Sequence, residues 1–348
     1  MIKQNLITLL LSISLIIFLF LCTSAHTESK VKPIELKVAT WNSPQLAPSK
    51  LAEKWGKMVE ERSGGKVKLV FYFSGSLVTM NDTYRAMQTG LVDIGMWVIG
   101  TIPGLHPLNE YISLPFMGWN DSKTALKVYH EIRDKFPELD AEFKGLKNIY
   151  TYAMPPYHIH TTKKTIRLPD DMGGMKILAD ATSSDFLHTL DAVAVSKGPA
   201  DWFMSLQRGL VDGQLLHWAA VDGFNLEELF TTHTQPGPAG LWFVFSGWWM
   251  NMDSWNRLPP EAQKAFIDLQ PWVEEEHLKL SLELEKKAQA DADETGHKII
   301  NLTPEEIDLW VKETEPVREK WIADMEKKGK PGRAIYEEAQ RLISLYNQ

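Results

Sequence analysis

The sequence has a single cysteine and no long run of like charges, and both absences exclude classes of function. Cys22 is the only cysteine in 348 residues, so the chain cannot form an internal disulfide or a thiolate metal cluster. No block of five like charges occurs, and the formal net charge of −8 argues against a nucleic-acid partner. An acidic chain can still hold a small anionic ligand, because a binding site can be locally basic.

The motifs of common enzyme classes are also missing. No Gly-x-Ser-x-Gly turn is present to hold a nucleophilic serine, and no strand is followed by a glycine-rich phosphate or dinucleotide motif. His158 and His160 are spaced to lie on one face of a strand, but no third ligand completes a metal site. We therefore expect no catalytic residue, metal or cofactor. A modest role for one of these histidines, as a hydrogen-bond donor facing a cleft, remains open.

The first 25 residues have the composition of a secretory signal peptide. Lys3 precedes an apolar run over residues 6–21, and small residues follow at 23–25. We predict cleavage after residue 25 and a periplasmic mature protein without Cys22. Its formal charge would be −9, because Lys3 is the only charged residue lost. The alternatives are a lipid anchor at Cys22 and a retained membrane helix, although the apolar run is slightly shorter than a comfortable bilayer span.

Alternating strand and helix patterns predict an α/β fold. Residues 35–40 and 66–73 are rich in the β-branched and aromatic residues of strands, and apolar residues recur at helical spacing over 48–61 and 82–89. The next strand is predicted to begin at Leu91. This alternation is typical of sheets covered by helices.

The C-terminal third is predicted to be helical. The prolines at 259–260 favour a helix start, and Pro271 is expected to kink or restart that helix. Residues 274–294 are rich in strong helix formers. A further helix should begin at Thr303 as N-cap, followed by Pro304.

Two ten-residue segments of the chain are similar to each other. Residues 84–93 read YRAMQTGLVD and residues 203–212 read FMSLQRGLVD. Gly90 and Gly209 stand where a helix C-terminus needs a left-handed residue. The match predicts two similar lobes that each present this element, and two unrelated helix–glycine–strand corners are the alternative.

Three of the 13 tryptophans follow predicted strands. Trp41 lies after the first strand, Trp97 after the strand that begins at Leu91, and Trp218 after the matching strand of the second segment. Ligands bind beyond the carboxyl ends of strands in open α/β sheets. We therefore predict that the three indoles converge on one cleft, with packing in the core as the alternative.

Short segments in a fixed order along nearly the whole mature chain carry a family resemblance. They are RSGGKV at 62–67, GLVDIG at 90–95, LPF at 114–116, TKK at 162–164, DMGGMKI at 171–177, LQRGLVDGQ at 206–214 and WNRLP at 255–259. Together they resemble the solute-binding proteins of TRAP transporters, the tripartite ATP-independent periplasmic systems.

The resemblance implies a two-lobed α/β periplasmic binding fold, with a hinge, a central cleft and a long helix spanning both lobes. It places lobe I at 26–156 plus 244–284 and lobe II at 157–243 plus 285–348. It also implies a protein that traps a small organic solute by lobe closure and delivers it to membrane permease subunits. We expect the protein to be a monomer. A ligand-sensing module for a membrane receptor is the alternative function.

Three departures from the family pattern bear on the ligand. Leu178 stands where the family has an arginine that pairs with a carboxylate, and His158 stands where a second arginine often lies. Leu215, Leu216 and His217 replace the usual Glu-Asn-Pro. The family's carboxylate chemistry therefore does not transfer residue by residue.

The replacement residues favour an aromatic or otherwise apolar organic solute. Trp41 and Trp97 fall at family positions that usually face the ligand, and aromatic rings suit a stacked ring or an ammonium group. Asp180 and Asp201 could pair with a cation, whereas Lys197 and His158 could still hold an acid. An organic-acid binder with such substitute anchors remains an alternative. The complete predicted site is Trp41, Trp97, His158, Leu178, Asp180, Lys197, Asp201, Gln214 and Trp218.

Overall fold

A computed structural model describes residues 32–180, 183–237 and 239–347. The predicted signal peptide and Cys22 lie outside the described residues. Residues 34–348 pack as one unit, and the fold below is that of this unit. None of the helices in the described part of the chain is both long and apolar enough to cross a lipid bilayer.

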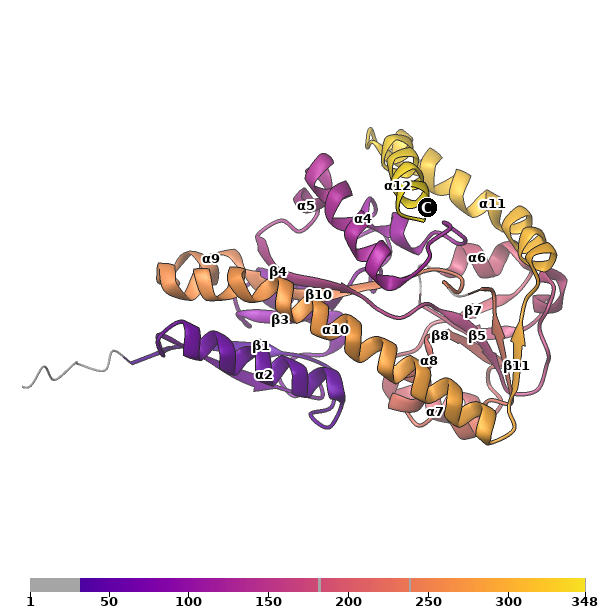
Figure 1. Cartoon of the computed structure of the whole chain (residues 1–348), viewed down its shortest axis with the longest axis horizontal. Coiled ribbons are helices and arrows are strands. Elements are labelled where there is room, and N and C mark those ends of the chain that lie inside the picture. The colour runs from indigo at the N-terminus through magenta and orange to yellow at the C-terminus, as the bar shows by residue number, and fades with distance from the viewer. Residues whose placement is uncertain (1–31, 181–182, 238, 348) are drawn as a thin grey trace, which may run out of the picture. The chain divides into compact units, whose positions relative to one another are not determined.

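The first sheet has five strands in the order β2-β1-β3-β10-β4 (Figure 1). β1 runs parallel to β2 and β3, while β10 is antiparallel to β3 and β4. The strands are β1 (Ile34–Ala39), β2 (Val67–Tyr72), β3 (Ile94–Val98), β4 (Leu146–Ala153) and β10 (Phe245–Asn251). The sheet therefore combines four strands from residues 34–153 with one strand from much later in the chain.

The second sheet has six strands in the order β11-β9-β5-β8-β6-β7. β6 is parallel to β7 and β8, and β5 is antiparallel to β8 and β9. The strands are β5 (His158–Thr161), β6 (Lys176–Leu178), β7 (Val193–Val195), β8 (Gly213–Leu216), β9 (Thr232–Gln235) and β11 (Lys298–Asn301). Each sheet thus has a parallel part that continues into antiparallel strands, and the predicted α/β class is confirmed.

Helices and short 3₁₀ turns pack around the sheets. They are α2 (Ala47–Arg62), α3 (Met80–Gln88), η1 (Asn109–Ser113), α4 (Ser122–Lys135), α5 (Glu138–Ala141), η2 (Pro169–Met172), α6 (Ser184–Thr189), α7 (Pro199–Gln207), α8 (Trp218–Gly223), η4 (Glu227–Leu229), α9 (Met252–Asn256), α10 (Pro260–Glu294), α11 (Pro304–Lys327) and α12 (Gly332–Tyr346). The C-terminal α12 packs against α4, and α11 packs against both α12 and α6.

Helix α10 is the long helix that the family resemblance implies. It packs against α2 and β4 at the first sheet and against α8 and β11 at the second (Figure 1). The helix is continuous over 35 residues with Pro271 inside it, so the expectation of a restart at this proline is wrong. Proline removes one hydrogen bond, to the carbonyl of Ile267, and packing against two layers holds the remaining turns in the helix.

The elements predicted for the start of the chain are largely confirmed. β1, α2, β2 and α3 each lie within two residues of their predicted bounds. The third strand begins at Ile94 rather than Leu91, because the amides of Leu91 and Val92 bond back to Ala86 in the preceding helix. Thr303 caps α11 as predicted, since its hydroxyl accepts a hydrogen bond from the amide of Glu306.

The internal similarity predicted from the sequence is confirmed at the helix ends. Gly90 and Gly209 both adopt left-handed conformations, with φ of 72° and 65°. The residue after each glycine donates its amide to a carbonyl five residues back, from Leu91 to Ala86 and from Leu210 to Ser205. The same Schellman-type ending therefore precedes β3 in the first sheet and β8 in the second.

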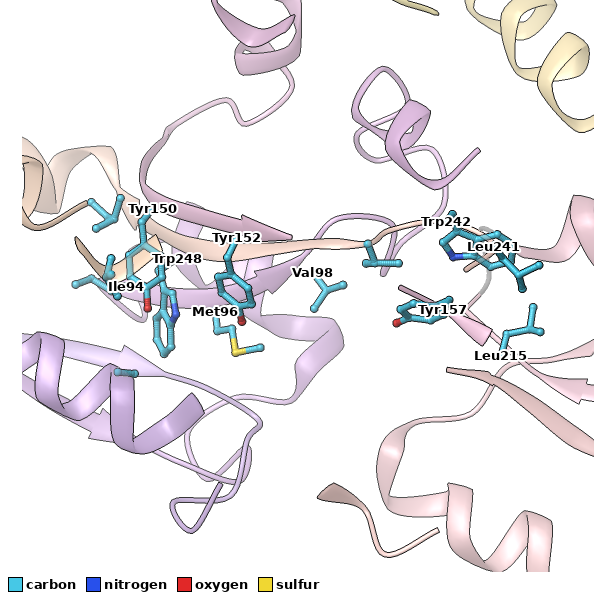
Figure 2. Close-up of a cluster of buried hydrophobic side chains, with 14 of the residues drawn as sticks. Ile94, Met96, Val98, Tyr150, Tyr152, Tyr157, Leu215, Leu241, Trp242 and Trp248 are labelled. Carbon is cyan, nitrogen blue, oxygen red and sulfur yellow. The ribbon is translucent and has the colours of Figure 1, made fainter. Parts of the chain in front are cut away.

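The largest apolar cluster takes side chains from both sheets. Figure 2 shows Met96 and Tyr152, from β3 and β4, on one side and Tyr157, Trp242 and Leu215 on the other. The strands present alternate residues to opposite faces, so residues on the far face of β3 belong to a separate cluster. The face that carries Met96 is the one that continues into the site described next.

Candidate functional site

A cavity of about 630 Å³ lies where the carboxyl ends of strands from both sheets meet. Its lining follows β1, β3 and β4 of the first sheet and β6, β7 and β8 of the second, and part of α10 completes it. The carboxyl ends of strands are the expected place for a ligand in open α/β sheets. A cavity of this size can enclose a small organic molecule.

The wall from the first sheet is mainly apolar and aromatic. Met96 and Val98 point into it from β3, and Tyr152 from the end of β4. Trp41 follows β1 by two residues and lines the same wall. Its indole Nε1 is buried and has no hydrogen-bond acceptor among the described residues, so a bound molecule could supply one.

The wall from the second sheet carries a carboxylate beside a phenol. Asp180 follows β6, and its Oδ2 accepts a hydrogen bond from the Tyr157 hydroxyl at 3.4 Å. Burial raises the pKa of the Asp180 carboxyl, while the bond from Tyr157 and the nearby His217 oppose this shift. Burial and the Asp180 charge together raise the pKa of Tyr157 well above its usual value, so Tyr157 remains a hydrogen-bond donor.

His217 adds a second donor to this wall. It is the N-cap of α8, and its Nδ1 accepts the amide hydrogen of Ala220 at 3.2 Å. A neutral imidazole that accepts at Nδ1 carries its hydrogen on Nε2. Behind the ring, the Glu285 carboxylate of α10 accepts the amide of Ala219 at 2.7 Å. The bond pattern therefore assigns Nε2 of His217 as the donor.

The part of the wall from α10 is built on a stacked pair of rings. His277 lies parallel to Tyr152, with ring centroids 3.9 Å apart and an interplanar angle of 2°. Its Nε2 lies 3.4 Å from the Tyr150 hydroxyl. Burial lowers the pKa of His277 to about 3, so the ring is neutral near pH 7 and presents an uncharged aromatic edge to the cavity.

Three of the nine predicted site residues line the cavity: Trp41, Asp180 and Lys197. Lys197 follows β7 and its side chain is exposed, while its carbonyl accepts the indole N–H of Trp202 at 2.9 Å. Trp202, from α7, also lines the cavity and packs edge-on against Phe224.

The structure places Trp97 away from the cavity. Its indole packs against Tyr84 and His106, with a centroid distance of 5.2 Å to Tyr84. Trp97 lies one position from Met96 and Val98, and successive residues of a strand point to opposite faces. Trp97 therefore does not join Trp41 at the cavity, and the predicted convergence of three tryptophans on one cleft does not occur.

Trp218 and Asp201 also lie outside the cavity lining. Trp218 is buried beside Ala288 and Ala292, and its ring lies over His233 with a centroid distance of 4.3 Å. Asp201 is exposed in the first turn of α7. In both cases the neighbouring residue, His217 or Trp202, lines the cavity instead.

The remaining three predicted residues are buried within the second sheet. Leu178 packs with Leu206 and Leu216 in an apolar cluster. Gln214 lies within β8, and its Oε1 has no donor among the described residues. Burial lowers the pKa of His158, on β5, to about 3, so the ring is neutral. These side chains support the wall from behind rather than line it.

Most of the lining was not predicted, and the unpredicted residues include the aromatic side chains of Tyr152, Tyr157, Trp202 and His277. His217 was recognised only as a departure from the family pattern. His217 follows β8, so the strand-end rule could have identified it had the strand bounds been known. Tyr157 precedes β5, which is antiparallel to β8, so the rule for carboxyl ends does not point to it. His277 has no such cue, because helical periodicity alone does not tell which face of α10 meets a cavity.

The groups in this cavity are suited to binding. Among the described residues, no group of three or more histidine, cysteine, aspartate or glutamate side chains is arranged to hold a metal ion. Aromatic walls, two hydrogen-bond donors and a carboxylate can hold an organic molecule and fix its orientation.

Comparisons with known proteins agree on one family. The model of the bacterial extracellular solute-binding proteins, family 7 (DctP), matches residues 38–324. A solute-binding protein of Verminephrobacter eiseniae is 24% identical over 226 residues, 62% of this chain. That alignment spans 64% of the relative's length.

Solved structures share the fold. A TRAP periplasmic solute-binding protein from Desulfovibrio salexigens, in an open complex, is 27% identical with a TM-score of 0.77, covering 90% of this chain and 96% of that one. A TRAP solute-binding protein from a marine metagenome, specific for aromatic acids and bound to 3-hydroxybenzoate, is 24% identical with a TM-score of 0.84. It covers 91% of this chain and 100% of that one. The fold class expected from the sequence is thereby confirmed.

Proposed function

Because the chain belongs to family 7 of the bacterial extracellular solute-binding proteins, we propose that it captures a small organic solute in this cavity and delivers it to a TRAP membrane permease. The family consists of binding proteins rather than enzymes. The proposal treats the bound molecule as cargo that leaves unchanged.

The observation that carries this proposal is the position of the cavity. It is lined by strand ends from two separate sheets, and α10 passes along both. A molecule bound there contacts groups from each sheet at once. Such contacts stabilise any arrangement that brings the two sheets together around the solute.

Lobe closure is the motion we propose for capture. The sheets are connected by the segment between β4 and β5, by the segment between β9 and β10, and by α10. We retain as a proposal the lobe boundaries 26–156 plus 244–284 and 157–243 plus 285–348. Closure about a hinge at these crossings would bring Trp202 and Asp180 towards Trp41 and exclude water from the site.

The solute class we propose is aromatic or otherwise apolar. Trp41, Tyr152, Tyr157 and Trp202 all line the cavity, and rings of this kind favour a flat apolar partner. The similar marine protein binds 3-hydroxybenzoate, which supports a ring-sized ligand. For the N-terminus, we propose a cleaved signal peptide over 1–25 and a periplasmic monomer.

Mass spectrometry of the protein under non-denaturing conditions tests the capture function. We expect a small organic molecule to co-purify and to raise the melting temperature when added back. Small-angle scattering of the emptied and reloaded protein should show a smaller radius of gyration with solute bound. Identical scattering profiles with a verified tight ligand would contradict closure, and a protein that binds no small molecule would contradict the function itself.

A further inference from the structure

The charged side chains that line the cavity differ in whether solvent or an oppositely charged group compensates them. Lys197 has an exposed side chain, and Asp222 is paired with Lys287 at 3.4 Å. Asp180 has no such partner: among the described residues, no lysine, arginine or histidine nitrogen lies within 4.0 Å of its carboxylate. Its hydrogen bond from the Tyr157 hydroxyl, at 3.4 Å, is long. Among the described residues, no arginine lines the cavity.

A carboxylate in this position costs stability unless something compensates it. Removing a charge from water without a partner is unfavourable, and burial accordingly raises the pKa of the Asp180 carboxyl. Among the described residues the protein supplies the Tyr157 hydroxyl and, beyond 4.0 Å, the imidazole of His217, which only partly opposes the effect of burial. A cationic group on a bound molecule would supply the missing charge.

The surroundings of Asp180 suit an organic cation better than a metal ion. Tyr157 donates to the carboxylate, and the rings of Trp41 and Trp202 also line the cavity. Aromatic faces attract ammonium groups, and this attraction grows when water is excluded. A hard metal ion would need several oxygen ligands, and no group of three or more carboxylate or histidine side chains in the described chain could hold one.

The same cavity offers donors for an acceptor on the solute. Nε1 of Trp41 is buried without an acceptor among the described residues, and Nε2 of His217 carries the hydrogen assigned above. We propose that the cavity selects an organic solute carrying an ammonium group, and that Asp180 is the residue that recognises this group. The inference rests on the proposed function, because it takes this cavity to be the solute site.

Two probes of the same size and opposite charge test the inference. 2-Phenylethylammonium and 3-phenylpropionate share a phenyl ring and a two-carbon spacer, and titration calorimetry on protein freed of bound small molecules gives both affinities. We expect the amine to bind at least tenfold more tightly than the acid. Tighter binding of the acid would overturn the inference while leaving the capture function intact.

The variant Asp180→Asn keeps the shape of the side chain and removes its charge. It should weaken amine binding about 10- to 100-fold, as expected for loss of hydrogen bonds to a charged group. Asp170→Asn, an exposed position in the same lobe that does not line the cavity, should bind the amine like the wild type. Unchanged amine affinity in Asp180→Asn would overturn the role of Asp180.

Folding of the Asp180→Asn variant is checked by its unfolding free energy without ligand. Because the carboxylate has no cationic partner, the variant should be at least as stable as the wild type. The molecule that co-purifies gives an independent readout. A solute with an ammonium group supports the inference, and a solute without one overturns it. If nothing co-purifies and neither probe binds, the capture function fails, and the inference fails with it.

Discussion

Asp93 and Asp212 make the same contact in the two sheets. Asp93 Oδ2 accepts the amide hydrogen of Lys37 at 2.8 Å, and Asp212 Oδ2 accepts that of Lys176, also at 2.8 Å. Each aspartate also donates its own amide to the carbonyl of the same lysine, at 3.0 and 2.7 Å. The Leu-Val-Asp endings of the two similar segments therefore connect β3 to β1 and β8 to β6 in the same way.

The two aspartates should differ in their contribution to stability. Asp93 is buried and also accepts hydrogen bonds from Ser254 at 2.6 Å and from Arg257 at 2.5 Å, whereas Asp212 is exposed. We expect Asp93→Ala to lower the unfolding free energy by about 3 kcal/mol and Asp212→Ala by about 1 kcal/mol. Urea denaturation of both variants measures the difference, and equal losses would contradict it.

We expect substitution of Trp41 to affect ligand affinity and substitution of Trp97 to affect stability. Trp41 lines the cavity, so Trp41→Ala should weaken binding of the co-purified solute by roughly 1–3 kcal/mol, by analogy with bases stacked on aromatic side chains. Trp97 packs in the core against Tyr84, so Trp97→Phe should lower the melting temperature and leave affinity unchanged. Calorimetric titration and thermal unfolding of both variants test this. Loss of affinity in Trp97→Phe alone would contradict the placement of these rings.

The fold could be predicted from the sequence because its determinants are local. Glycines with left-handed φ end the helices at Gly90 and Gly209, and the capping pair Thr303 and Glu306 begins α11. Each is specified by residue types a few positions apart. The discontinuous course of the chain through the two sheets came from the family resemblance instead, since no local pattern pairs β10 with β3 and β4.

Three predicted residues missed the cavity by one position, and for the two tryptophans among them the reason is the same. Trp97, Asp201 and Trp218 each stand next to a residue that lines the cavity, namely Met96, Trp202 and His217. The strand-end rule identifies the right corner of the sheet but not which side chain points into it. A shift of one residue turns a strand side chain to the other face, and the predicted strand start at Leu91 was three residues too early.

Small dicarboxylates should bind poorly. Leu178, where the family resemblance implies an arginine, packs in an apolar cluster, and the lining taken from the described residues includes Lys197 but no arginine. A carboxylate loses charge-assisted bonds of about 1.5–3 kcal/mol each when no arginine is present. Succinate and malate should therefore produce no shift in melting temperature at concentrations near 100 μM, roughly the middle of the range of ordinary substrate affinities.

The control for this prediction is Lys197→Ala. Because the Lys197 side chain is exposed, we expect the variant, like the wild type, to show no shift in melting temperature with succinate at this concentration. A tight succinate complex that this variant abolishes would show instead that Lys197 replaces the family arginine.

Stability should decrease steeply as the pH falls below about 6.5, the pKa of an unfolded histidine. Burial lowers the pKa values of His158, His160 and His277 to about 3, of His233 to about 2 and of His106 to about 4. Between pH 6.5 and 4 the unfolded chain therefore binds protons that the folded chain does not. Each such histidine contributes a loss of up to about 1.4 kcal/mol per pH unit.

A substitution at His106 removes the contribution of one of these histidines to the pH dependence of stability. Both of its ring nitrogens are buried without partners among the described residues, and the ring stacks on Phe143 with centroids 4.1 Å apart. His106→Phe keeps that stacking and gives up only a contact with the Glu142 backbone that favours the protonated ring, so its stability at pH 7.5 should stay close to that of the wild type. Between pH 6 and 4.5 its unfolding free energy should decrease less steeply, by about 1.4 kcal/mol per pH unit. Urea denaturation across this range gives both slopes, and equal slopes would mean that His106 is already protonated in the folded protein or already neutral in the unfolded one.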